Sequence, residues 1–389
     1  MTDSSSSISS INAVPLVLHV IPTARARGAQ REARALADHL DRPGVRHHRV
    51  LCLYAGSDEV SVDRSLARDG GDSPGVGLDG RAIFGLRAAL ADMDPDVVVA
   101  HGSEPLKHLV PAMLGRARPL AYYAIGTYSG SDRRSQIRLW RTLVARADVV
   151  AAEGQEVRAE CIDRLGVSPS RIVVTPNGRP ADVFHPPDHD AVGSPPPRLL
   201  FVGALTTGKR PDVFVEAVEA LRARGFELRA TVIGDGPLRG ALTERATRAG
   251  VELLGARSDI AACMRQADLL VFPSRPEGEG MPGVLIEAGL SELPVVATDA
   301  PGVDSIVSTG TTGLVVPVDD LDALVAAAAA LLADRRLRRR MGKAARARCQ
   351  DQFSLDVVGR IWMDLLQPLL DAGIRGRPRR RPTRRSTHP

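Results

Sequence analysis

The chain has 389 residues, 44% of them hydrophobic, a size and composition that predict two or three globular domains, each burying its own core. The net charge of +5 includes seven arginines between Arg375 and Arg385, and without these seven it would be −2, so the body of the chain gives no reason to expect nucleic-acid binding. Neither a spanning apolar run of about 18 residues nor a secretion signal is evident, which favours a cytoplasmic protein.

Short apolar runs alternate with amphipathic helical patterns through the first half of the chain. After a serine-rich start at 1–13, expected to be disordered, strands are predicted at 16–21, 50–53, 97–100, 120–124, 149–152 and 172–174, and helices between them include 28–40 and 81–93. Alternation of this kind is typical of a parallel sheet covered by helices. We therefore expect a Rossmann-like α/β domain over residues 14–185.

A second alternation of the same kind follows a segment rich in proline. Residues 186–198 are predicted to be a linker, and residues 199–350 a second Rossmann-like domain with strands at 199–202, 229–233, 269–272, 295–297 and 313–316. Further helices are expected at 351–373, before a basic, disordered tail at 374–389.

Two carboxylates flank a glycine-rich turn in the second half. The run 268–273 is predicted to be a buried strand, residues 278–283 a loop and residues 284–290 a helix, so that Glu279 lies in the loop and Glu287 in the first turns of the helix. Backbone N–H groups at such a junction attract anions, and carboxylates beside it accept hydrogen bonds from sugar or ribose hydroxyls. The stretch therefore predicts a ligand site.

This stretch resembles the Glu-x7-Glu signature of the family 4 retaining glycosyltransferases. Further matches occur in the family's order: Phe201-Val202-Gly203 with Lys209, then segments 232–237, 267–287, 293–299 and 312–317. The resemblance implies the GT-B architecture, in which two Rossmann-like parallel-sheet domains face each other across a cleft. The first domain would bind the acceptor, the second would bind the nucleotide-sugar donor, and the helices at 351–373 would cross back to the first.

The resemblance also implies roles for residues of the second domain. Glu287 would accept hydrogen bonds from the ribose hydroxyls, and Glu279 would face the donor sugar; Glu277 competes for this role, but Glu279 keeps the family spacing. Lys209 would contact the donor diphosphate. The family usually has an arginine just after the glycine, where this chain has Ala204, and Arg210 is the nearest replacement. The complete set of implied donor-binding residues is Gly28, Gly203, Lys209, Arg210, Glu279, Gly280, Met281, Pro282, Gly283, Val284 and Glu287.

For two residues of the first domain, Gly28 and His101, the sequence allows both a functional and a structural role. Gly28 is either close to the donor, where relatives often have two adjacent glycines, or a plain turn glycine. His101 follows the strand at 97–100, in a segment that resembles an acceptor-domain motif, and is either catalytic, together with Glu279 and Lys209, or structural. The segment 122–128 lacks the histidine that many relatives have near the reacting sugar.

The resemblance implies retaining transfer of a hexose-type sugar from a UDP- or GDP-linked donor to a glycan, lipid or small-molecule acceptor. No metal and no cofactor are expected, and Asp94-Pro95-Asp96 is interpreted as a strand cap. Two alternatives remain: a phosphorylase or sugar-phosphate synthase of the same fold, and an inactive nucleotide-sugar-binding relative, suggested by Ala204 and the missing histidine. The tail Arg375–Arg385 is either a solvated extension or a peripheral contact with anionic lipid at the inner face of the membrane.

Overall fold

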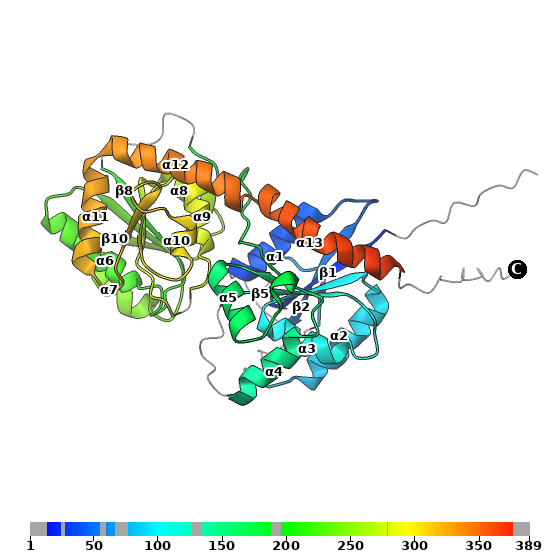
Figure 1. The fold of residues 1–389 in the computed structure, drawn as a ribbon. Coiled ribbons are helices and arrows are strands. Elements are labelled where there is room, and N and C mark those ends of the chain that lie inside the picture. The colour runs from blue at the N-terminus through cyan, green and yellow to red at the C-terminus, as the bar shows by residue number, and fades with distance from the viewer. Residues whose placement is uncertain are drawn as a thin grey trace, which may run out of the picture. The chain divides into compact units, whose positions relative to one another are not determined.

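A computed structural model of the chain describes residues 14–24, 28–54, 60–66, 77–126, 134–187, 196–277 and 279–375. The start at 1–13, the tail from residue 376 and linker residues 188–195 lie outside the described residues, so the predictions made for them stay predictions. Figure 1 shows the described elements, coloured from blue at the beginning of the chain to red at its end.

The first sheet has seven strands among the described residues, in the order β3-β2-β1-β4-β5-β6-β7. The pairs β3–β2, β2–β1, β1–β4 and β4–β5 are all parallel, and β1 lies between β2 and β4. The strands are β1 (Leu16–Thr23), β2 (His47–Tyr54), β3 (Arg64–Ser65), β4 (Val97–His101), β5 (Leu120–Ala124), β6 (Val149–Ala152) and β7 (Ile172–Val174). The helices that follow them are α1 (Gly28–Leu40), α2 (Gly80–Met93), α3 (Ser103–Ala112), α4 (Arg134–Val144) and α5 (Gln155–Asp163), with a 3₁₀ turn at Pro169–Arg171 before β7.

The second sheet repeats this strand order. Its described strands are arranged β10-β9-β8-β11-β12-β13, again in parallel pairs. They are β8 (Arg198–Val202), β9 (Arg229–Ile233), β10 (Val251–Gly255), β11 (Leu269–Phe272), β12 (Val295–Thr298) and β13 (Gly313–Val316). The helices are α6 (Pro211–Ala223), α7 (Arg239–Arg248), α8 (Ile260–Gln266), α9 (Gly283–Leu290), α10 (Val303–Ile306), α11 (Leu321–Ala333), α12 (Arg335–Phe353) and α13 (Leu355–Arg375).

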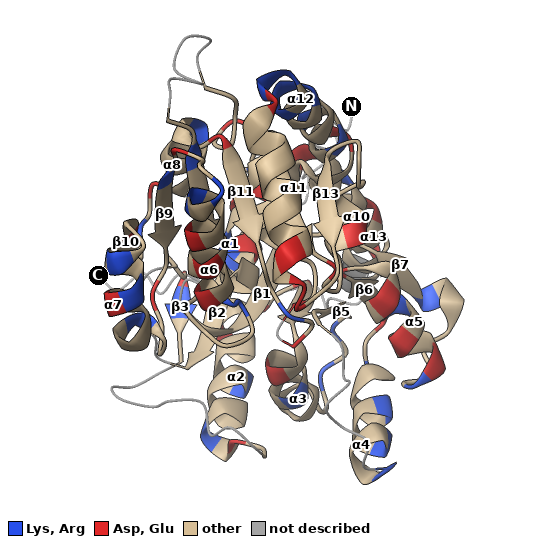
Figure 2. Cartoon of the chain, turned by 90° about the vertical axis from the view of Figure 1, so that its left-hand side faces the viewer, with Lys and Arg blue, Asp and Glu red and all other residues tan. Residues whose placement is uncertain are grey.

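Helices cover both faces of the second sheet, because its strands are apolar on both sides. Alternate residues of β8 point to opposite faces: Phe201 packs with α6, α7 and α11, whereas Leu200 packs with α8, α9 and α10. Figure 2 shows α11 lying over β11 and β13. Helix α11 carries a single charged residue, Asp322 in its first turn. These two cores hold β8 and β11 in place. The loops at the carboxyl ends of these strands contain the predicted site residues Gly203, Lys209 and Glu279.

All eleven predicted strands are present, and β3 and β10 were missed. β3 has two residues, and β10 is an edge strand whose Glu252 is exposed, so neither gives a continuous apolar run. The expected boundary at residue 350 falls inside α12, and α13 continues to Arg375 rather than ending at 373.

By contacts, the described residues within 14–123, 142–150 and 363–375 form one compact unit, and those within 124–141 and 151–362 form another. The predicted domain limits stay predictions. Among the described residues, none of the helices combines the length and apolarity needed to cross a bilayer.

Candidate functional site

The strand order of the second sheet reverses between β8 and β11, and several predicted site residues follow these two strands. Gly203 comes directly after β8, with Lys209 later in the same loop, and Glu279 lies in the loop after β11. Ligands of open parallel sheets bind at the carboxyl ends of strands at such a reversal. The predicted residues therefore occupy the position that this fold class uses for binding.

Lys209 and Glu279 form an ion pair, although they are 70 residues apart in the sequence. The Glu279 side chain is 3% exposed and that of Lys209 26% exposed, so the cation is the more accessible partner. The Lys209 ammonium also lies 5.6 Å from the centroid of the Phe272 ring, at the end of β11. The sequence predicted both residues but not their pairing.

Glu287 lies one turn into α9 and is paired with Arg179. The Arg179 Nε donates to Glu287 Oε1 at 2.8 Å, and the two side chains are 9% and 19% exposed. Gly283, the first residue of α9, leaves room for this guanidinium: a Cβ built there would lie 1.8 Å from Arg179 Nη2. Arg179 was not predicted as a site residue, because a basic residue after Asn177-Gly178 matches no motif.

Two buried polar side chains hold the loop at 279–283. Glu153, directly after β6, is 2% exposed, and its carboxylate accepts hydrogen bonds from the N–H groups of Gly126, at 2.7 Å, and Met281. Asn177 Nδ2 donates to the Met281 carbonyl oxygen at 2.7 Å. Burial raises the pKa of Glu153 to about 7. Sequence reasoning missed Glu153 too; an acid immediately after a buried strand was the available signal.

Gly280 and Met281 border a cavity of about 160 Å³. Glu153, Gln155 and Asp304 contribute to its polar lining. A larger cavity, of about 400 Å³, is bordered by β8, β9, β10 and α8. None of the predicted site residues lines this larger cavity.

Arg210, the suggested substitute for the missing arginine, is engaged by two carboxylates. It adopts a left-handed backbone conformation (φ 51°) at the N-cap of α6, pairs with Asp319 and has its Nε 3.2 Å from Asp212 Oδ2. Ala204 is exposed. Pro282 is the N-cap of α9, and Val284 is its second residue.

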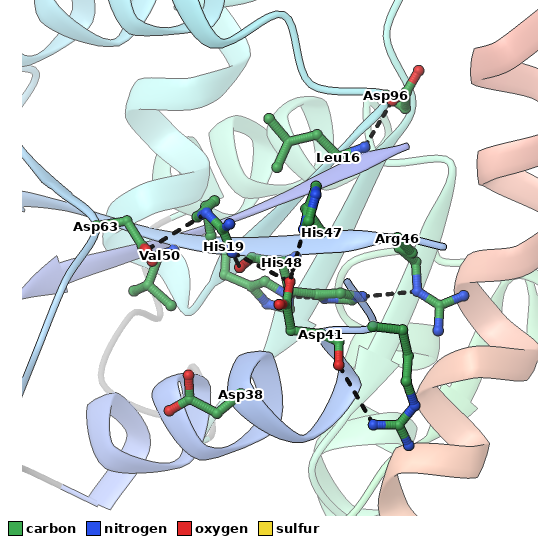
Figure 3. A network of polar contacts seen from close by, with 12 residues as sticks. Leu16, His19, Asp38, Asp41, Arg46, His47, His48, Val50, Asp63 and Asp96 are labelled. Carbon is green, nitrogen blue, oxygen red and sulfur yellow. Dashed lines mark hydrogen bonds and ion pairs between the residues drawn. The ribbon is translucent and has the colours of Figure 1, made fainter. Parts of the chain in front are cut away.

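In the first sheet, His101 is the last residue of β4 and belongs to a line of buried rings. His101 Nε2 lies 2.9 Å from His19 Nδ1, and His19 Nε2 lies 2.9 Å from His48 Nδ1. The line ends at Arg46, whose Nε donates to His48 Nε2 at 3.0 Å, as Figure 3 shows for its outer half. Burial lowers the pKa of His101 and of His48 to about 3 and that of His19 well below its usual range.

Gly28 is the first residue of α1 rather than part of a loop, and a Cβ built on it would meet no atom within 4 Å. Its surroundings therefore do not require glycine, and residues 25–27 lie outside the described residues.

Asp94 and Asp96 make structural contacts. Asp96 Oδ2 accepts from the Leu16 N–H at the start of β1, at 2.8 Å, and Asp94 pairs with Arg118, so a cap on the strand that follows them stays a prediction. Within the described part of the chain, no group of three or more His, Cys, Asp or Glu side chains is arranged to hold a metal ion.

Both halves of the chain match glycosyltransferase family models. Residues 26–183 match "Glycosyltransferase Family 4", and residues 196–334 match "Glycosyl transferases group 1". The chain is 33% identical over 169 residues to an alpha-D-kanosaminyltransferase of Streptomyces kanamyceticus, covering 42% of this chain and 43% of that protein. It is also 33% identical over 221 residues to a D-inositol 3-phosphate glycosyltransferase of Nocardia farcinica, covering 52% and 49%. The chain thus spans less than half the length of either relative.

The fold is similar to that of a solved structure, HepE from Anabaena in complex with UDP and glucose. The TM-score is 0.72 at 19% identity, over 90% of this chain and 99% of that one. The predicted class of two parallel-sheet α/β domains, GT-B, is confirmed. Together the matches support a family of the glycosyltransferase 4 type.

Proposed function

We propose that this chain, whose two halves match glycosyltransferase families, transfers a hexose-type sugar from a UDP- or GDP-linked donor to a hydroxyl acceptor, with retention of the anomeric configuration. The observation that carries the proposal is the Lys209–Glu279 pair at the strand-order reversal of the second sheet, eight residues before Glu287. A cation, a sugar-facing carboxylate and a ribose-facing carboxylate are what a nucleotide-sugar requires.

Lys209 is assigned to the donor diphosphate. Its ammonium is the more exposed partner of the ion pair, so an incoming phosphate can share it with Glu279. As the bond between the sugar's anomeric carbon and the phosphate oxygen breaks, negative charge grows on the departing diphosphate. A positioned cation lowers the free energy of that separating charge.

Glu279 is assigned to the hydroxyls of the donor sugar. Its position is fixed from two sides, by the ion pair and by the loop contacts of Glu153 and Asn177 to the neighbouring Met281. In the transfer, the acceptor oxygen bonds to the anomeric carbon on the face that the diphosphate leaves, and the acceptor proton passes to a leaving phosphate oxygen. Holding both reactants in place supplies a large part of such a barrier.

Glu287 is assigned to the ribose hydroxyls, with Arg179 as its partner. A carboxylate has more acceptor positions than one guanidinium N–H occupies, so Glu287 can accept from Arg179 and ribose together. The start of α9, where backbone N–H groups face outward, favours an anion nearby. We propose that no metal ion takes part, since Lys209 and this helix start offer the positive charge.

The test is turnover by the full chain. Purified protein is incubated with a panel of UDP- and GDP-sugars and mixed glycan, lipid and polyol acceptors, with and without EDTA, and release of the nucleoside diphosphate is followed by chromatography. Products are then examined by NMR for the anomeric configuration. We expect nucleoside diphosphate to be released with one donor only, and equally in the presence of EDTA. The product should have the same anomeric configuration as the donor.

The matched variants are Glu279→Gln and Glu277→Gln. Glu277 is exposed and lies two residues away. Loss of at least tenfold in turnover for the first and little change for the second supports the assignment. Binding of a donor without release of any product would favour the inactive relative, and transfer onto inorganic phosphate would favour a phosphorylase.

A further inference from the structure

The buried line Arg46–His48–His19–His101 has a direction, because one of its ends can only donate. A guanidinium has N–H donors and no acceptor. Arg46 Nε lies 3.0 Å from His48 Nε2, so this ring nitrogen accepts and carries no proton. A neutral imidazole with an accepting Nε2 has its proton on Nδ1.

The same argument passes from ring to ring. His48 Nδ1 carries the proton and lies 2.9 Å from His19 Nε2, which must therefore accept. His19 then has its proton on Nδ1, which donates to His101 Nε2 at 2.9 Å. His101 in turn has its proton on Nδ1. Each step requires a neutral ring, since an imidazolium would place two N–H groups face to face.

The surroundings favour neutral rings. His19, His48 and His101 are buried, on neighbouring strands of the sheet. The charged groups that act on them are mainly cations: Arg34 of α1 acts on His19 and His48, and Arg46 and Arg49 act on His48. Asp41 opposes them, but it accepts from the His48 backbone N–H at 2.7 Å (Figure 3) and from Arg49 at 3.2 Å.

We propose that Arg46, through His48 and His19, fixes His101 as the neutral imidazole with its proton on Nδ1. Arg46, His48 and His19 are then positioning residues. His101 Nε2 has its lone pair engaged by His19, and the buried Nδ1 carries the proton, so His101 has no basic nitrogen to offer. Resting on the proposed function, this means that His101, at the end of β4, does not act as a general base in the transfer.

The positive charge of Arg46 strengthens this order of protons. Hydrogen bonds in a chain polarise one another when the local dielectric is low. The pull of the guanidinium on His48 is passed to His19 and then to His101, and it favours the proton on Nδ1 of each ring.

Nitrogen NMR of the full chain labelled with ¹⁵N at histidine tests the proposal without any substrate. Protonated and bare ring nitrogens give well-separated signals, and the rings are assigned by comparison with His19→Gln, His48→Gln and His101→Gln. For the unsubstituted protein we expect a protonated Nδ1 and a bare Nε2 on all three rings. A proton on Nε2 of His101, or a charged ring at neutral pH, would overturn the proposal. Spectra of the unsubstituted protein are enough for this outcome.

The role of Arg46 is tested by three variants. Arg46→Met removes the donor and should give a mixture of tautomers at His101, whereas Arg46→Lys keeps a donor-only cation and should restore the Nδ1 form. Arg49→Met removes a nearby charge that donates to Asp41 and to the His48 carbonyl, and should leave the three rings unchanged. Unchanged rings in Arg46→Met would refute Arg46 as the cause. Turnover plays no part in this outcome, so failure of the proposed sugar transfer would be seen separately.

Discussion

Arg179 and Glu287 join the segment after β7 to the first turns of α9 through a 2.8 Å contact between Nε and Oε1. Both side chains are largely buried, and Arg179 is also held by the Gly178 carbonyl oxygen at 2.9 Å. The carboxylate assigned to ribose is therefore already oriented before a nucleotide arrives.

The Arg179–Glu287 pair should contribute to stability as well as to binding. Glu287→Ala leaves a largely buried guanidinium without this partner, and we expect the free energy of unfolding to fall by about 2 kcal/mol, as for a hydrogen bond to a charged group. Urea denaturation measures the change. In a double-mutant cycle with Arg179→Met, the second substitution should recover part of the loss; strictly additive losses would contradict the coupling.

Gly283 should not tolerate a methyl group. In Gly283→Ala the new Cβ would lie 1.8 Å from Arg179 Nη2, so the guanidinium must leave Glu287, and we expect a loss of about 2 kcal/mol. Gly240→Ala in α7 is the matched control, since a Cβ there meets no atom within 4 Å and alanine favours a helix by up to about 1 kcal/mol. Equal melting temperatures for the two variants would argue against this packing.

The histidine line should make the protein sensitive to acid. The pKa of His48 and of His101 is about 3 in the folded chain against 6.5 for a free histidine, so unfolding takes up protons below about pH 6.5. This stability is fully present above pH 6.5 and is lost as the pH falls toward 3, by up to about 1.4 kcal/mol per pH unit for each ring. Urea denaturation from pH 7 to 4 should show a shallower slope for His48→Gln than for His185→Gln, which lies outside the line.

Glu153 should make the protein less stable as the pH rises, the reverse of the effect of the histidine line. Burial raises its pKa from 4.5 to about 7, so the folded chain keeps the proton that the unfolded chain loses, and this contribution to stability is lost as the pH rises from 4.5 through 7. Compared with Glu153→Gln, the unsubstituted chain should lose stability over that window, by at most about 1.4 kcal/mol per pH unit. Glu156→Gln, on the exposed first turn of α5, is the control and should follow the unsubstituted chain. Parallel curves for Glu153→Gln and the unsubstituted chain would show that Glu153 stays ionised.

The sequence predicted the parallel sheets well because apolar runs such as Leu269–Phe272 are buried on both faces and contain little else. A motif with fixed spacing also marks Lys209, Glu279 and Glu287 as candidates, and their roles stay predictions. The sequence could not predict what these residues contact. Arg179 and Glu153 are 108 residues before Glu287 and 126 before Glu279, and no local pattern pairs residues so far apart. The histidine line was missed for the same reason: His19, His48 and His101 come from three strands that only the sheet order makes neighbours.

The most direct measurement is the thermal stabilisation of the full chain by UDP- and GDP-sugars, compared among the unsubstituted protein, Glu287→Ala and Glu277→Gln. A ligand that binds the folded state at 100 times its Kd adds about 2.7 kcal/mol of stability, enough for a clear rise in melting temperature. We expect a rise with donors of one base, kept in Glu277→Gln and lost in Glu287→Ala. No rise with any donor, or an equal rise in Glu287→Ala, would refute the assignment of Glu287 to the nucleotide-sugar.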